Sequence, residues 1–330
     1  MFIRRAVPAA AALVLLAGCA AAPDDGAAPD DGAAGRVRVL AAVYPLEYVV
    51  EQVGGEHVEV ATLTPAGTDP HAVELSPRQL RDVGAADLVV HLGGFQAAVD
   101  DAVAERAADR SLDVADAADL RPAARDDHAD DDADHADADR ADADRADADR
   151  ADTDDAHGHL GLDPHFWLDP ERLAAVGHAV ADALARTDPG HAEEYAAGAD
   201  ALAADLAALD EEYRAGLADC AADVVVTSHA AFGYLTDRYG LRQVSVSGLE
   251  PEGEPSPARI REVREVVAGL AVDAVFTEPL ADPAVAATLA EGLGVAVLTL
   301  DPLDSHDGGP GYREVMTANL AALRDGLGCR

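Results

Sequence analysis

Two of the twelve histidines lie in the same local sequence. His71 and His165 each follow an Asp-Pro pair, in the stretches "TDPHAVEL" and "LDPHFWLDP". Proline restricts φ, and the preceding aspartates can accept N–H bonds from the backbone or from an imidazole ring. Imidazoles held in this way suit a metal site, whereas a single loop histidine is more often a surface or turn residue. Asp69 and Asp163 therefore either orient two metal ligands or simply form turns.

Two further polar side chains come directly after expected strands. His229 follows "VVVTS", and Asp301 follows "VAVLTL". Three imidazoles and one carboxylate are a complete tetrahedral ligand set for a divalent metal such as Zn²⁺. The four residues form no short local motif, so their spacing alone leaves metal binding and ordinary loop roles both open. His306 is a reserve ligand, and four other histidines are interpreted as structural: His57, His91, His178 and His191.

Strands alternate with helices in the part of the chain that follows residue 36. Strands are expected at 36–43, 58–65, 87–93, 223–229, 242–247, 273–277 and 295–300. Helices are expected from Pro77 with Ser76 as N-cap, at about 96–108, from Pro170 to Arg186 with Asp169 as N-cap, and at 230–239, 257–270, 283–293 and 312–327. This alternation predicts parallel sheets that are covered by helices on both faces.

One helix is expected to be much longer than the others, from about Pro189 to Leu217. Its apolar residues recur at helical spacing: Tyr195, Leu202, Leu206, Leu209, Tyr213 and Leu217. At 1.5 Å per residue the helix is roughly 40 Å long, enough to cross one lobe and reach a second. The predicted fold is therefore α/β, with two Rossmann-like lobes at 36–188 and 218–330 that are joined by a linker helix at 189–217.

Ligands of open parallel sheets bind beyond the carboxyl ends of the strands. Two of the four candidate ligands belong to the first lobe. His71 lies in the loop after the strand at 58–65, and His165 lies in the last loop of this lobe. The other two, His229 and Asp301, follow strands of the second lobe. A site between facing lobes would bring all four together.

The N-terminus is typical of an export signal. Arg4 and Arg5 precede an apolar run that is too short to span a membrane, and "LLAGC" ends at Cys19. This pattern resembles the cleavage box of bacterial lipoproteins, although an ordinary secretory signal remains the alternative. We therefore expect a signal peptide at 1–18, lipidation of Cys19, and a flexible tether at 19–35 that holds the folded part outside the cytoplasm at the cell membrane.

The composition is strongly acidic, with a formal net charge of −39. Residues 126–155 hold 15 Asp against 3 Arg, so this segment contributes −12 of that charge. Because it lacks branched apolar residues, the segment 126–159 is predicted to be a disordered insertion. The overall charge argues against nucleic acid as a partner and favours a metal cation.

Two cysteines remain beyond Cys19, namely Cys220 and Cys329. Outside the cytoplasm such a pair can form a disulfide. The sequence does not show whether the two residues lie within bridging distance, so both the bonded and the free state stay open.

Several longer stretches resemble one family of proteins, and they occur in that family's order. They are "TDPHAVELSPRQL", "DPHFWLDPERL", "TSHAAFGYLTDRYGL", "GLEPEGEPSPARI", "FTEPL" and "LDPLDS". Together they are similar to the metal-binding solute receptors of bacterial ABC importers, the ZnuA-like and TroA-like family. The resemblance implies two α/β lobes bridged by a rigid helix, a metal between the lobes, and the membrane permease of an ABC importer as partner; we expect a monomer.

Transferred motif by motif, the resemblance implies His71, His165, His229 and Asp301 as ligands. Family members that favour Mn²⁺ tend to have a carboxylate where this chain has His229, so Zn²⁺ is expected and Mn²⁺ is the alternative. A zinc-dependent hydrolase with Glu278 as general base is a further alternative. It is weaker, because a fourth ligand would close the position that a catalytic zinc keeps for water. We therefore expect a receptor and not an enzyme.

Overall fold

A computed structural model describes the chain at 35–122, 161–249, 256–270, 272–280, 290, 294–306 and 308–330. The chain divides into two units, Met1–Gly35 and Arg36–Arg330, and all elements below belong to the second. Several predictions lie outside the described residues: the signal peptide, the lipidated Cys19, the acidic insertion at 126–159, and the helix at 283–293 apart from Ala290, which is helical. Among the described helices, none combines the length and the apolar character that a membrane crossing requires.

The first sheet has four parallel strands in the order β2-β1-β3-β4. They are β1 (Val37–Ala41), β2 (Val58–Thr62), β3 (Leu88–His91) and β4 (Ser111–Asp113). The second sheet repeats this topology as β6-β5-β7-β8. Its strands are β5 (Val224–Thr227), β6 (Arg242–Ser245), β7 (Ala274–Thr277) and β8 (Ala296–Thr299). The prediction of two α/β lobes with parallel sheets is confirmed.

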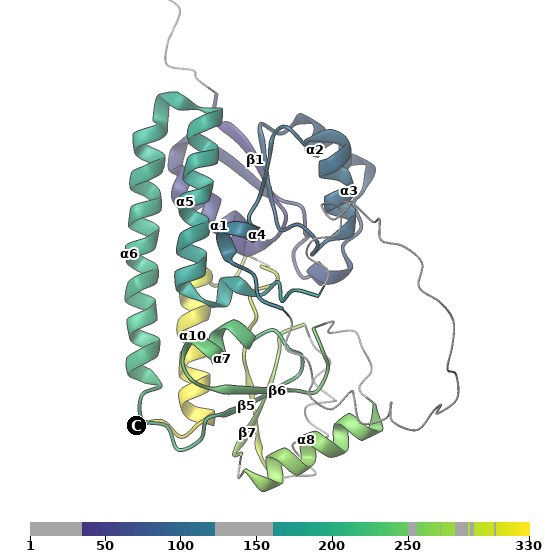
Figure 1. Ribbon diagram of the computed structural model, residues 1–330, viewed down its shortest axis with the longest axis vertical. Helices are drawn as coiled ribbons and strands as arrows, with labels where there is room; N and C mark the ends of the chain where they lie inside the picture. The colour runs from purple at the N-terminus through teal and green to yellow at the C-terminus, as the bar shows by residue number, and fades with distance from the viewer. Residues whose placement is uncertain are drawn as a thin grey trace, which may run out of the picture. The chain divides into compact units, whose positions relative to one another are not determined.

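Helices connect the strands and cover the sheets (Figure 1). Their bounds are α1 (Tyr44–Gly54), α2 (Pro77–Ala85), α3 (Ala97–Arg106), α4 (Ala115–Ala118), α5 (Pro170–Thr187), α6 (Ala192–Gly216), α7 (Gly233–Arg238), α8 (Pro257–Gly269) and α10 (Tyr312–Gly326). The predicted caps are present: Ser76 accepts the N–H of Gln79 at the start of α2, and Asp169 accepts the N–H of Glu171 at the start of α5. Local sequence thus sets where these helices begin.

The N-terminal half of the long helix α6 packs against α1 and α5, and its C-terminal half packs against α10 (Figure 1). It begins after a 3-10 turn, η4 (Pro189–His191). Its buried face contains five residues of the predicted apolar stripe, Tyr195, Leu202, Leu206, Leu209 and Tyr213, and also Ala199. The hydroxyl of Tyr213 donates to the Met316 carbonyl on α10 at 2.7 Å. One helix therefore contributes to the core beside both sheets.

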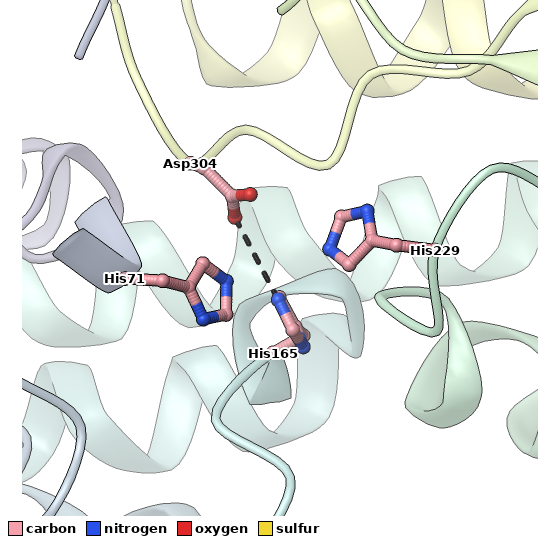
Figure 2. A group of neighbouring side chains, drawn as sticks. All are labelled: His71, His165, His229 and Asp304. Carbon is pink, nitrogen blue, oxygen red and sulfur yellow. Dashed lines mark ion pairs between the residues drawn. The ribbon is translucent and has the colours of Figure 1, made fainter. Parts of the chain in front are cut away.

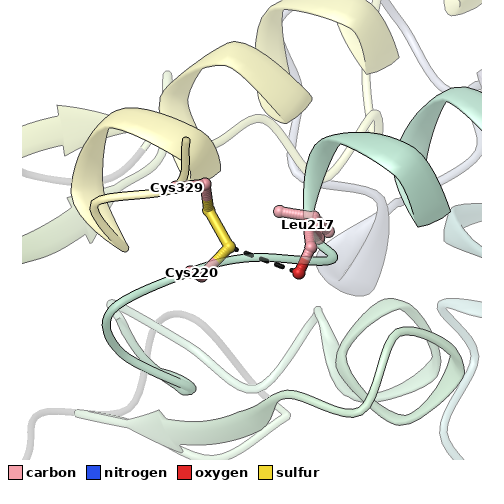
Figure 3. The surroundings of a disulfide bond; sticks show 3 residues. All are labelled: Leu217, Cys220 and Cys329. Carbon is pink, nitrogen blue, oxygen red and sulfur yellow. Dashed lines mark hydrogen bonds between the residues drawn. A yellow bond between two sulfur atoms is a disulfide. The ribbon is translucent and has the colours of Figure 1, made fainter.

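Cys220 and Cys329 form a disulfide in the structure (Figure 3). Cys220 follows the end of α6, and its sulfur lies 3.3 Å from the carbonyl oxygen of Leu217. Cys329 follows the end of α10. The bond therefore ties the C-terminal tail to the segment that leads from the long helix into β5.

In both sheets the second strand of the chain lies on one side of the first strand, and the third and fourth strands lie on its other side. In the first sheet this change of side lies between β1 and β3, and in the second it lies between β5 and β7. Loops that leave the carboxyl ends of strands on opposite sides of such a point leave a crevice for ligands. The loops after β2, β5, β7 and β8 supply most of the polar residues described next.

Candidate metal centre

Four side chains from separate loops converge at one place (Figure 2). They are His71, His165, His229 and Asp304, and one possible ligand atom from each lies within 4.8 Å of the others. The centroids of the His71 and His165 rings are 5.3 Å apart, as are those of His165 and His229. Within the described ranges this is the one group of its kind. The structure therefore gathers the three predicted histidines.

His71 is held mainly through its backbone. It lies in the 3-10 turn η2 (Pro70–Ala72), where Asp69 Oδ1 accepts the His71 N–H at 2.9 Å. Behind the turn, the amide of buried Gln96 donates to the Pro70 carbonyl and to the Thr64 hydroxyl, both at 3.0 Å. These bonds fix the turn that carries His71.

His165 is fixed through both its backbone and its ring. Asp163 Oδ1 accepts the His165 N–H at 3.0 Å and lies 2.8 Å from His165 Nδ1. A carboxylate only accepts, so Nδ1 carries the proton and Nε2 is left as the ligand atom. Asp163 thus performs both predicted roles, as turn former and as the group that orients the ring.

His229 has a similar carboxylate partner from the neighbouring strand. Glu278, directly after β7, places Oε2 2.5 Å from His229 Nδ1, and its Oε1 accepts the His229 N–H at 3.2 Å. The hydroxyl of Ser228 also donates to Glu278. A carboxylate on the second nitrogen makes the first nitrogen a better metal ligand.

The atoms that face the centre accept or donate no hydrogen bond within the described part of the chain. The Nε2 atoms of His71, His165 and His229 and the Oδ1 atom of Asp304 are buried without a hydrogen bond among the described residues. His165 Nε2 and Asp304 Oδ1 are 4.0 Å apart, too far for a hydrogen bond. Buried polar atoms are normally satisfied, so four such atoms in one place indicate a missing partner. A metal cation is a partner that accepts all four.

Burial sets the protonation of two members of this group. The pKa of His71 is lowered to about 3, mainly by burial and further by the nearby rings of His165 and His229. His71 is therefore neutral near pH 7, as a metal ligand must be.

Asp304 shows the opposite effect. Burial raises its pKa well above the ordinary value, and the nearby carboxylates of Glu278, Asp69, Asp301 and Asp163 raise it further. Without a cation, burial and these neighbouring carboxylates therefore favour the protonated form of Asp304. A divalent ion in the centre would offset the repulsion and favour the carboxylate form.

The sequence-based choice of Asp301 differs from the structure, where Asp304 takes the carboxylate position. The Asp301 carboxylate turns back on its own loop, and its Oδ1 accepts the Leu303 N–H at 2.8 Å. Leu303 then adopts the left-handed conformation, with φ at 63°. The chain reverses there, and the next residue points toward the histidines (Figure 2).

A signal for this outcome was present in the sequence. Asp69, Asp163, Asp169 and Asp301 each precede proline, and each accepts the N–H of the residue two positions later. At these four positions Asp-Pro forms a turn in which the aspartate accepts a backbone N–H bond. Consistent use of that rule would have assigned Asp301 to the turn.

The reserve ligand His306, two of the other histidines and the tryptophan that follows His165 have structural contacts. His306 stacks on Tyr44 with ring centroids 4.3 Å apart and does not belong to the group. The buried Trp167 donates from Nε1 to the Pro302 carbonyl at 2.8 Å. Among the histidines interpreted as structural, His57 and His191 stack on each other at 3.9 Å.

Comparison with known proteins gives a consistent picture. A family model described as "ZnuA: Zinc-uptake complex component A periplasmic" matches residues 39–326. Zinc-binding protein AdcA of Streptococcus pyogenes serotype M6 is 32% identical over 296 residues, covering 88% of this chain and 56% of AdcA. High-affinity zinc uptake system protein ZnuA of Bacillus subtilis is 27% identical over 327 residues, covering 96% of this chain and 95% of that protein. This chain thus spans about half the length of its AdcA relatives.

Solved structures agree with these sequence matches. AdcAII of Streptococcus pneumoniae superposes with a TM-score of 0.72 at 25% identity, covering 89% of this chain and all of that one (100%). Zn(II)-bound AdcA of the same species gives a TM-score of 0.69 at 28% identity, covering 89% of this chain and 58% of that one. The two-lobed fold is therefore shared with both proteins, one of which, AdcA, was solved with zinc bound.

Proposed function

The chain belongs to the ZnuA family of zinc-uptake components, and from this premise we propose that it captures Zn²⁺ outside the cytoplasm for an ABC importer. The metal would lie between a lobe of residues 36–188 and a lobe of residues 218–330, joined by the linker at 189–217. The membrane permease of the importer would be the partner that receives it. In this proposal the protein is a receptor without catalytic activity, and it acts as a monomer.

The proposed ligands are Nε2 of His71, His165 and His229 and a carboxylate oxygen of Asp304. The observation that carries the proposal is the set of four buried atoms without hydrogen-bond partners, each facing the other three. Four protein ligands close the tetrahedron of Zn²⁺ and leave no position for a reacting water. Glu278, the general base of the hydrolase alternative, is occupied with the His229 ring.

The donor set favours zinc over manganese. Three of the four proposed ligand atoms are imidazole nitrogens, which suit Zn²⁺, whereas Mn²⁺ prefers more oxygen ligands. The relatives are in accord, because AdcA and ZnuA both carry zinc in their names.

The proposed location is the outer side of the cell membrane. The relative from Streptococcus pneumoniae serotype 4 is named a zinc-binding lipoprotein, and this chain has a cysteine at the end of its lipobox-like stretch, Cys19. We propose removal of 1–18, lipidation of Cys19, and a tether at 19–35. A Cys19→Ser variant is expected to be released from the membrane fraction of expressing cells.

Metal preference tests the proposal directly. The protein lacking residues 1–19 is refolded with equimolar Zn²⁺ and Mn²⁺, and bound metal is measured by mass spectrometry. We expect one zinc per chain. Affinity is then measured by competition with a chromophoric chelator, beside the His229→Ala variant.

The variant should bind zinc at least about 100-fold more weakly, because the loss of a ligand exceeds the 10–100-fold effect of removing an outer-shell partner. A manganese-loaded product would overturn the metal assignment. Tight zinc binding that survives His229→Ala would instead place the metal somewhere else.

A further inference from the structure

The loop that carries Asp304 is attached to the C-terminal lobe at its base. Buried Asn319 of α10, 2% exposed, accepts the Asp301 N–H at 2.9 Å and donates to the Asp301 carbonyl at 2.7 Å. This pair of bonds fixes where the loop leaves β8.

The far end of the same loop is attached to the other lobe. Ser305 Oγ accepts the N–H of Gly67, which follows β2, at 2.8 Å. The His306 ring stacks on Tyr44 at the start of α1, with an interplanar angle of 15°. Gly67 has a φ of 70°, a left-handed conformation that suits glycine and that directs its N–H toward Ser305. Two consecutive residues after Asp304 thus bind the N-terminal lobe.

The residue between these two attachments is strained. Leu303 has a φ of 63°, which is unfavourable for a side chain with a Cβ, and its side chain is buried. Such a conformation persists only where the surroundings hold it on both sides. Release of the Ser305 and His306 contacts would therefore let Leu303 relax and let Asp304 turn away from the three histidines.

We propose that Ser305 and His306 are positioning residues that hold Asp304 in the metal centre by docking on Gly67 and Tyr44 of the opposite lobe. Neither residue belongs to the group of ligands. The inference rests on the proposed function, and it adds that retention of the fourth ligand depends on contact between the lobes. Separation of the two lobes would therefore loosen Asp304 first and speed the release of metal.

The double variant Ser305→Ala/His306→Ala tests this role. Zinc-loaded protein is mixed with an excess of chromophoric chelator, and the dissociation rate is read from the colour of the chelator complex. One hydrogen bond and one aromatic stack are lost, so we expect zinc to dissociate at least about tenfold faster. Thermal unfolding of the zinc-free variant should stay close to that of the wild type.

Two comparisons separate positioning from a general loss of structure. The control His191→Ala removes another stacked histidine outside the centre and should leave the dissociation rate unchanged. In an Asp304→Asn background the double substitution should alter the rate less than about twofold, because contacts that act through a shared partner are not additive.

An unchanged rate in the double variant overturns the positioning role, as does a full effect that persists with Asp304→Asn. Failure of the wild type to bind zinc would instead overturn the proposed function. The two failures are therefore distinct.

Discussion

The three histidines of the centre differ in what fixes their rings. His165 and His229 have a carboxylate at Nδ1, from Asp163 and Glu278. His71 is held through its backbone, and its ring packs edge-on against Phe95 with centroids 4.9 Å apart. In the first two cases the carboxylate fixes both which ring nitrogen faces it and the orientation of the ring, so Nε2 is directed at the centre before a cation arrives.

The first prediction concerns the two aspartates of the loop. Asp304→Asn should lower zinc affinity by at least about 100-fold, since a proposed ligand is lost and second-shell losses alone reach 10–100-fold. Asp301→Asn should cost less than tenfold, because asparagine can also accept the Leu303 N–H in the same turn. Competition titration with a chelator measures both variants. Equal losses would contradict the assignment of Asp304.

A second prediction follows from the raised pKa of Asp304. When the pKa of an acid is higher in the folded protein than in the unfolded chain, the protein loses stability as pH rises. The loss begins near the pKa of the unfolded chain, about 3.9, and ends above the pKa of the folded protein, because only the unfolded chain gives up the proton freely between them. Asparagine cannot ionise. Zinc-free Asp304→Asn should therefore become increasingly more stable than zinc-free wild type as pH rises from 4 to 8.

Urea unfolding at several pH values measures this difference. The lowered pKa of His71 has the opposite effect, because the protein loses stability as pH falls from about 6.5 toward 3. This loss is the same in the wild type and in Asp304→Asn, so it cancels in the comparison. A constant difference across the pH range would show that Asp304 does not hold its proton.

At the scale of elements, the sequence predicted the positions of the buried strands more accurately than those of short elements and loop-flanked helices. All seven predicted strands contain an observed one, because runs such as "VVVT" of β5 are buried on both faces. β4 has only three residues, too few for a periodic pattern, and was not predicted. The helix expected at 230–239 is shortened to α7, since 230–232 belong to the loop beside His229.

Helix α7 is tied to two other helices by one arginine. Arg238 donates to Asp210 Oδ1 of α6 at 2.6 Å and to Glu171 Oε2 of α5 at 2.8 Å, and it lies 3.0 Å from Asp169 Oδ1. Its side chain is 12% exposed. These contacts join the C-terminal lobe both to the linker helix and to the cap of the helix that follows His165.

The third prediction tests this junction. Arg238→Met should destabilise the protein by about 3 kcal/mol, because it removes the largely buried cation that Asp169 and Asp210 share and leaves them only their pairs with Arg172 and Arg214. Arg214→Met is the matched control: Arg214 also pairs with Asp210, but its side chain is 55% exposed, so the loss should stay below about 1 kcal/mol. Urea unfolding at neutral pH measures both. Similar losses in the two variants would argue against a special role for Arg238.

At the scale of the whole molecule, a disulfide joins the segment after α6 to the C-terminal tail. The disulfide links residues 109 positions apart in sequence. Backbone bonds run beside it, from Ala221 N–H to the Leu327 carbonyl and from Arg330 N–H to the Asp219 carbonyl. The end of the chain is thus held next to the end of α6, away from the residues of the proposed centre.

The fourth prediction is that Cys220→Ala/Cys329→Ala lowers the free energy of unfolding by about 2–5 kcal/mol, as is typical for loss of a native disulfide. Zinc affinity should not change, because neither cysteine contacts the four proposed ligands. Denaturant unfolding and a chelator titration of the same sample measure the two quantities. A drop in affinity would show that the tail and the centre are coupled.

The sequence by itself determined what depends on neighbours along the chain. The helix caps at Ser76 and Asp169, the Asp-Pro turns and the buried strands are local, and the three histidines follow from their places after strands and turns. The resemblance in motif order then implied the two-lobed fold, which the structure confirmed.

Only the tertiary structure decided which aspartate completes the group. Asp301 and Asp304 are three residues apart, and both follow the same strand. Their difference arises from the left-handed turn at Leu303 and from the bond between Ser305 and Gly67, which are 238 positions apart. A contact across that separation exists only when both lobes are folded. The Asp-Pro pattern could therefore mark Asp301 as a turn residue, but no local pattern could place Asp304 beside the three histidines.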